Sequence, residues 1–153
     1  MLNRNDLDKI KKEIEEFLRK MTVEIETESL EQKEDTVHFS IRIQEPQVLI
    51  GERGQTLLDI QHLLSAILRK KIEGLFYLDL DINEYKKKKI EYLKELARSA
   101  ADEVALTKKE KILPAMPAYE RRIIHMELAD KGNITTESIG KEPERTIVIK
   151  PYP

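Results

Sequence analysis

The chain contains no cysteine and no tryptophan, and it has only three histidines among its 153 residues. The absence of cysteine excludes a disulfide framework and a thiolate metal site, and it is typical of proteins of the reducing cytosol. No apolar run reaches the roughly 18 residues that a transmembrane helix needs, and no signal-peptide pattern is present. The sequence therefore predicts a cytoplasmic protein with no membrane partner.

Residue patterns typical of enzymes are also missing. His38, His62 and His125 are far apart, and no set of His, Asp and Glu has the spacing of metal ligands. Neither a Walker-type loop nor a Gly-x-Ser-x-Gly nucleophile motif occurs. We therefore expect a non-enzymatic protein that uses no metal and no cofactor.

The charge of the chain is small and unevenly distributed. Hydrophobic residues make up 40% of the sequence, which is enough to fill a core, and the formal net charge is −2. Residues 1–83 hold 12 Lys+Arg against 17 Asp+Glu, and residues 84–153 hold 15 against 12. Any contact with nucleic acid must therefore use local basic patches, because the chain as a whole is not basic.

Hydrophobic periodicity divides the chain into elements of helical and alternating pattern. The first half predicts helix, strand, strand, short helix, helix and strand, at residues 6–20, 22–30, 36–44, 47–50, 54–72 and 76–83. The polar residues 31–35 should link the first two strands as a hairpin in an antiparallel sheet with one face covered by helices.

The second half begins with a long amphipathic helix over residues 84–107. An extended, proline-containing link follows, then a helix and two short strands, at residues 111–117, 119–130, 134–138 and 146–150. The expected fold is of the α+β class. It consists of two small α+β modules, residues 1–83 and 84–153, which the long helix joins.

The most informative stretch is Ile-Gly-Glu-Arg-Gly-Gln at residues 50–55, in which two glycines bracket two charged residues. Glycine can adopt left-handed backbone angles and leaves room for a ligand to lie against the main chain. The amides of a following helix then suit phosphate oxygens, as in a GxxG loop that holds about four nucleotides. The loop residues predicted to contact nucleic acid are Gly51, Glu52, Arg53, Gly54, Gln55 and Thr56.

These loop residues have different expected roles. Arg53 is the natural phosphate contact, and Gln55 and Thr56 can donate hydrogen bonds from the start of the next helix. A Gly54→Asp substitution is expected to weaken binding while leaving the fold intact, because it places a negative charge beside the phosphate. The alternative interpretation is that the two glycines only form a turn between two helices.

A second candidate site lies in the helix predicted over residues 119–130. Arg121 and His125 are four residues apart, so a helix places them on one face. A guanidinium donates in a fork suited to phosphate, and a histidine gains charge near pH 6.5. We expect this pair and Arg122 on an exposed face, beside Lys141 or Arg145 from the following strand connection. The alternative is a structural role, in which a buried His125 ties the helix to the sheet.

A basic run opens the helix over residues 84–107. Lys86 and Lys87 are candidate contacts for RNA phosphates, and the alternative is a solvated helix start.

Two longer patterns carry a resemblance to a known family. Residues 117–125 and 138–145 resemble the domain named for its Arg-three-His spacing, which is associated with single-stranded nucleic acids. The helix–strand–strand–helix–helix–strand order around the GxxG loop resembles the type II KH fold. Together the two motifs resemble the bacterial Jag family, also called SpoIIIJ-associated or KhpB proteins, over about residues 20–150. That family commonly has a basic residue where this chain has Glu52, and its separate N-terminal Jag domain is not expected in this sequence.

The resemblance implies an RNA-binding protein with a role in post-transcriptional regulation, in some members with a small KH protein as partner. We expect single-stranded RNA, or single-stranded DNA, to bind through the loop and the Arg-three-His helix. The alternative function is a protein-interaction scaffold, whose acidic first half and Glu52 prevent tight binding of nucleic acid.

Overall fold

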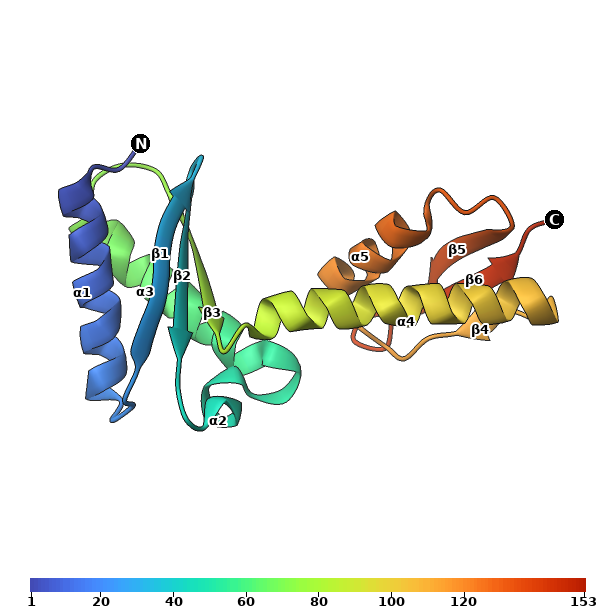
Figure 1. Ribbon diagram of the computed structural model, residues 1–153, viewed down its shortest axis with the longest axis horizontal. Helices are drawn as coiled ribbons and strands as arrows, with labels where there is room; N and C mark the ends of the chain where they lie inside the picture. The colour runs from blue at the N-terminus through green and yellow to red at the C-terminus, as the bar shows by residue number, and fades with distance from the viewer. The chain divides into compact units, whose positions relative to one another are not determined.

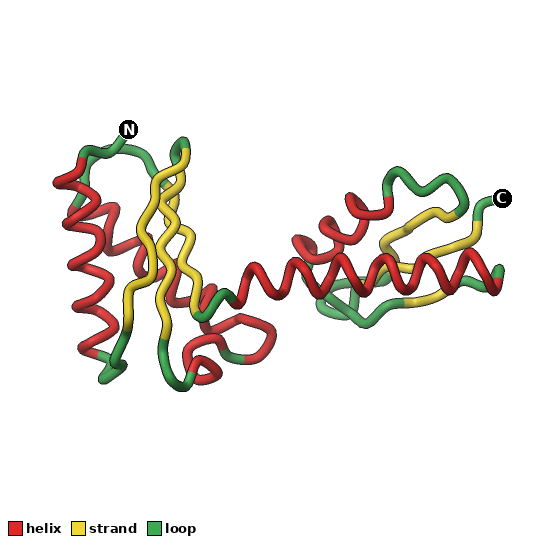
Figure 2. Tube along the Cα trace, viewed as in Figure 1, coloured by secondary structure: helices red, strands yellow, loops and turns green.

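The computed structural model describes all of residues 1–153 and divides them into two compact units (Figure 1). Unit 1 is Met1–Lys86 and unit 2 is Lys87–Pro153. Each unit combines helices with a small sheet, which confirms the predicted α+β class (Figure 2). The division falls just inside the long helix, whereas the sequence placed it before that helix, after residue 83.

Unit 1 follows the predicted order of elements. They are α1 (Arg4–Lys20), β1 (Glu26–Lys33), β2 (Thr36–Arg42), α2 (Pro46–Ile50), a 3₁₀ turn η1 (Glu52–Gly54), α3 (Gln55–Lys71) and β3 (Tyr77–Ile82). The sheet order is β1-β2-β3, with β1 and β2 antiparallel but β2 and β3 parallel. The predicted antiparallel hairpin of the first two strands is confirmed, whereas the parallel direction of β3 was not predicted. The reason is the connection through α2 and α3, which returns the chain to the end of the sheet at which β2 began.

The hairpin between β1 and β2 is tighter than the sequence predicted. Lys33 pairs with Thr36, so the loop consists of Glu34 and Asp35 alone, and Glu34 has a φ of 55°. Two-residue hairpin loops need such left-handed angles, because these match the twist of the strands. Residues 31–33 thus belong to β1, and residues 22–25, which were expected to be strand, precede it.

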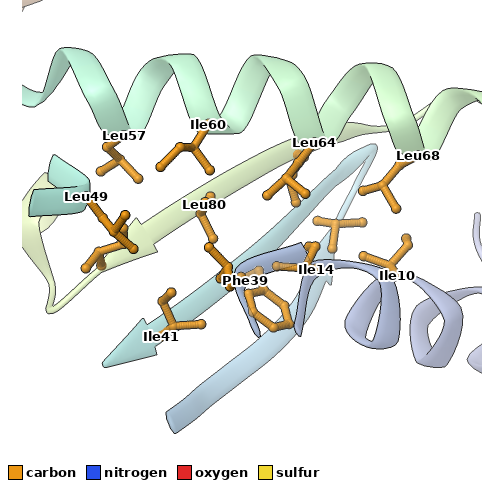
Figure 3. Packing of buried hydrophobic residues seen from close by; sticks show 14 of the residues in the cluster. Ile10, Ile14, Phe39, Ile41, Leu49, Leu57, Ile60, Leu64, Leu68 and Leu80 are labelled. Atoms are coloured by element: carbon orange, nitrogen blue, oxygen red, sulfur yellow. The ribbon is translucent and has the colours of Figure 1, made fainter. Parts of the chain in front are cut away.

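One apolar core fills unit 1. The sheet turns alternate side chains of β2, Val37, Phe39 and Ile41, inward, and all three are fully buried. Helices α1 and α3 supply the other side of this core (Figure 3). The helical periodicity of α3 places Leu57 and Leu64 against the sheet, which fixes where α3 begins relative to β2. The core therefore positions the loop that precedes α3.

Unit 2 is built around a second small sheet. Its elements are α4 (Tyr85–Thr107), which starts at the end of unit 1, then β4 (Lys111–Ile112), α5 (Ala118–Leu128), β5 (Ile134–Ile139) and β6 (Thr146–Pro151). The strands are antiparallel in the order β4-β6-β5. Strand β4 was expected to be an extended link, because two residues are too few to show an alternating pattern.

The core of unit 2 uses small residues on α4. Ala97, Ala100 and Ala101 are buried there, and they pack in one cluster with Ile124 of α5 and Ile147 of β6. None of the helices in either unit combines the length and the apolar character that crossing a bilayer requires.

Candidate nucleic-acid interface

The glycines of the GxxG loop are required by contacts within unit 1. Gly51 has φ 73° and ψ −175°, and a Cβ placed on it would lie 2.1 Å from Thr56 Oγ1. Gly54 has φ 78°, and its Cβ would lie 2.8 Å from Cε1 of Tyr85. Gly54→Asp is therefore expected to strain the loop as well as to weaken binding. That substitution would also displace the Tyr85 ring, so it does not isolate an effect on binding.

Tyr85 is a residue that the sequence did not mark as part of the site. It is the first residue of α4, it is partly buried against the core of unit 1, and its ring packs on Gly54. A contact between residues so far apart along the chain leaves no local pattern. The only available signal was a tyrosine at a helix start.

The two charged residues between the glycines are exposed. Arg53 has φ 55° and ψ 23°, a left-handed conformation that is uncommon for residues other than glycine, and both Arg53 and Glu52 are exposed. The ion pairs of the chain involve neither of these residues. Arg53 is thus a cation that no other side chain neutralises, and Glu52 is an equally unneutralised anion beside it.

The first turn of α3 faces the same loop. Gly54 is the N-cap of this 17-residue helix, and no side chain caps it. The first backbone amides of a helix have no intrahelical acceptor and carry a partial positive charge. The side chain of Gln55, predicted as a donor to phosphate, instead donates to Asp59 Oδ1 at 2.9 Å. The Gln55 amide donates to the carbonyl oxygen of Glu52, and the Gly54 amide donates to that of Gly51. Neither amide is therefore free for a ligand, and Thr56 is half-buried against Gly51.

The lysines at the start of α4 differ in their surroundings. Lys86 Nζ lies 2.6 Å from Asp79 Oδ1 and 2.5 Å from Gln61 Oε1, so it is held inside unit 1. Burial alone would raise the pKa of Asp79, but hydrogen bonds and charge from Lys86 and His38 outweigh it and lower that pKa. Lys87 is exposed. Lys86 is thus engaged within unit 1, whereas Lys87 is still open to either interpretation, a phosphate contact or a solvated helix start.

Arg121 is buried, which contradicts the expectation of an exposed signature pair. The residue retains 7% of its accessible surface. Its Nη1 donates to the carbonyl oxygen of Met116 at 2.5 Å and its Nη2 to Glu142 Oε1 at 2.6 Å. The guanidinium therefore ties α5 to the segment before it and to the β5–β6 connection. The neighbouring Arg122 is exposed.

His125 lies half-buried between α5 and the sheet. Its Nδ1 is 2.6 Å from Thr136 Oγ1 of β5. Burial, together with the positive charge of Arg121, lowers the pKa of His125 below its ordinary value of 6.5. The imidazole is therefore neutral at pH 7, so it adds no positive charge to this surface.

Acidification is expected to destabilise unit 2 through His125. Because the pKa of His125 is lowered in the folded chain, the unfolded chain takes up its proton first as the pH falls below about 6.5. The free energy of unfolding should then decrease between that pH and the lower pKa of the folded state. Urea denaturation at about pH 7.5 and about pH 5.5 measures the decrease. His125→Gln, which does not titrate, should show a smaller decrease, and equal decreases in both proteins would contradict this account.

The β5–β6 connection carries the remaining predicted residues. Arg145 donates from Nε to Ser138 Oγ at 2.9 Å and from Nη1 to the carbonyl oxygen of Gly140 at 2.8 Å, whereas Lys141 is exposed. Arg145 thus holds the connection closed. Internal hydrogen bonds occupy Arg121 and Arg145, and the predicted cations of this site that are exposed are Arg122 and Lys141.

Comparison with known proteins shows what the chain is similar to. Residues 91–151 match the family model of the Arg-three-His domain, which is the domain predicted from the sequence. A Clostridium symbiosum protein named RNA-binding protein KhpB is 35% identical over 129 residues, which cover 84% of this chain and 58% of that protein. The chain is similar to KhpB proteins.

Other KhpB relatives give the same result. The Bacillus subtilis (strain 168) protein named RNA-binding protein KhpB is 35% identical over 123 residues, 79% of this chain and 59% of that protein. The Lactiplantibacillus plantarum KhpB is 36% identical over 102 residues, 67% of this chain and 32% of that protein. The chain thus spans less than two thirds of the length of these KhpB relatives.

Proposed function

We propose that this chain is a non-enzymatic RNA-binding protein that acts in the cytoplasm and holds single-stranded RNA by its backbone. The observation that carries the proposal is the exposed, unpaired Arg53 between two glycines, at the start of α3, where no side chain caps the helix. Phosphate binds at helix N-termini through the same combination of amides and charge. The names of the KhpB relatives support RNA as the ligand.

Unit 1 is proposed to be a KH domain of type II. Its support is the order of elements, with α2 and α3 flanking the loop and β2 parallel to β3. A GxxG loop between two helices is the part of a KH domain that clamps the nucleic-acid backbone. Of the predicted binding residues of unit 1, Glu52 and Arg53 are exposed and take part in no ion pair.

Unit 2 is proposed to add a second, weaker contact. Its exposed cations Lys87, Arg122 and Lys141 are the candidates, while Arg121, His125 and Arg145 support them from within. Two weak sites on one chain raise the overall affinity, because the second binding event becomes intramolecular. Post-transcriptional regulation, and a small KH protein as partner, belong to this proposal.

The test is a titration of the full chain with a labelled single-stranded RNA of about 12 nucleotides. Binding should weaken with salt with a log–log slope of about −0.7 for each phosphate neutralised. Single-stranded DNA of the same sequence and duplex RNA serve as comparison ligands. No binding at low salt and micromolar concentration would reject the proposal in favour of a protein-interaction scaffold.

Glu52→Lys is expected to strengthen RNA binding. The substitution removes an unpaired anion beside the proposed phosphate path and adds a cation there. Two unit charges about 4 Å apart interact by about 1 kcal/mol in water, so the gain should be less than about tenfold at physiological salt. The matched control is Glu31→Lys, the same charge change at an exposed position of β1. Equal gains for both variants would show a general effect of net charge and remove Glu52 from the path.

A further inference from the structure

Two exposed tyrosines lie on neighbouring helices of unit 2. Tyr92 of α4 is 59% exposed and Tyr119 of α5 is 54% exposed. The chain has only five tyrosines and three phenylalanines, so aromatic side chains on its surface are few. Exposed rings are normal when they occur singly, but these two are connected.

The ion pair between Lys89 and Glu120 contacts both tyrosines. Lys89 Nζ lies 3.5 Å from Glu120 Oε1, and the hydroxyl oxygen of Tyr119 lies 3.5 Å from the same Oε1. The same Nζ lies over the Tyr92 ring, 5.6 Å from its centroid. The pair therefore bridges α4 and α5 and contacts one tyrosine on each helix.

Burial explains why this bridge is well held. The carboxylate of Glu120 is 5% exposed, and a buried charge without a partner is costly. The ammonium group of Lys89 neutralises the Glu120 carboxylate. Moving Lys89 away would leave that buried carboxylate unpaired, which is unfavourable. A fixed cation also attracts the electron-rich face of the Tyr92 ring. Both rings are thus restrained before any ligand arrives, which lowers the entropy lost on binding.

The charges around the rings suit a polyanion that also carries flat bases. Lys88 precedes Tyr92 by one helical turn, Arg122 follows Tyr119 by one turn, and both are exposed. The acidic neighbours of Tyr92 on α4 are Glu91 and Glu95, and Glu95 lies 3.6 Å from Arg98 Nη1. Glu91 is thus the one carboxylate in this group that no ion pair neutralises.

We propose that Tyr92 and Tyr119 form a stacking surface for unpaired nucleobases, with Lys88 and Arg122 contacting the adjoining phosphates. The proposal rests on the proposed RNA-binding function and extends it from backbone contacts to base contacts. Every base has a π face, so stacking on tyrosine binds single strands with little sequence preference, and it excludes duplexes whose bases are already stacked. The surface therefore gives unit 2 selectivity for single-stranded nucleic acid.

The test measures RNA affinity of full-chain variants that remove the tyrosine ring, remove only its hydroxyl group, or remove another exposed tyrosine. Tyr92→Ala and Tyr119→Ala should each weaken binding of a single-stranded RNA of about 12 nucleotides by at least about fivefold, whereas Tyr92→Phe and Tyr119→Phe should bind like the wild type. The matched control is Tyr152→Ala, since Tyr152 is also 59% exposed in unit 2. An oligonucleotide with abasic positions should bind the wild type and the alanine variants equally. Circular dichroism establishes that each variant is folded.

The outcomes separate this inference from the function on which it rests. If the wild type binds RNA and the alanine variants bind it within about twofold of the wild type, the stacking surface is rejected and RNA binding stands. If the phenylalanine variants lose as much affinity as the alanine variants, the hydroxyl groups matter and stacking is again rejected. If the wild type itself does not bind RNA, both proposals fail.

Discussion

Gly51→Ala is expected to destabilise unit 1 by about 2–4 kcal/mol and to abolish binding through the loop. At φ 73° and ψ −175°, Gly51 occupies a region of backbone angles that is nearly exclusive to glycine, where other residues carry about 1–3 kcal/mol of strain. A Cβ there would also lie 2.1 Å from Thr56 Oγ1 and 2.7 Å from Thr56 Cβ. Thr56 is fixed in the first turn of α3, so the loop must move instead.

The control for this experiment is Gly132→Ala. A Cβ at Gly132 meets nothing within 4 Å, and this glycine has no positive φ. Urea denaturation and RNA titration of both variants provide the measurements. A Gly51→Ala protein as stable as Gly132→Ala would show that the loop geometry described above is not the one in solution.

Arg121→Ala is expected to destabilise unit 2 by about 2 kcal/mol or more. The substitution leaves the carbonyl oxygen of Met116 without its buried donor, and an unsatisfied buried group costs about 1–3 kcal/mol. The ion pair with Glu142 adds little, because the Glu142 side chain is 57% exposed and water screens it. Loss of the packed aliphatic part of Arg121 adds to the effect.

Arg122→Ala is the matched control, since it removes an exposed arginine from the next position of α5. It should change stability by less than about 0.5 kcal/mol and should weaken RNA binding instead. Urea denaturation measures both variants, and amide hydrogen exchange of β6 assigns the transition to unit 2. Equal stability losses in the two variants would contradict a structural role that is specific to Arg121.

Local patterns predicted the elements well where one face is buried along many residues. The helical periodicity of α3 and the alternation of β2 both reflect the same core, so their existence and order could be predicted. The predicted loop between β1 and β2 began too early and was too long, because polar residues 31–33 pair as strand even though they resemble a loop. Strand β4 and the parallel pairing of β3 depend on partners distant in sequence.

The candidate sites divide in the same way. Arg53 and the two glycines were identified from spacing alone. A tight turn between two helices needs backbone angles that favour glycine, so the glycines mark the turn in the sequence. The surroundings of Arg121 and Lys86 could not be predicted. The spacing of Arg121 and His125 shows that they share a helix, but it does not show whether that face meets solvent or another part of the chain.

The sequence by itself determined the α+β class, the order of elements, the GxxG loop and the similarity to KhpB proteins. All of these are properties of residues close together in the chain, or of motifs in a fixed order. Only the tertiary structure decided which charges are available to a ligand. It buried Arg121 against the β5–β6 connection, engaged Lys86 with Asp79, and left Arg53 and Arg122 exposed. Burial and ion pairing depend on residues brought together from distant positions in the chain. A cation that is already paired with a carboxylate inside the protein attracts phosphate only weakly.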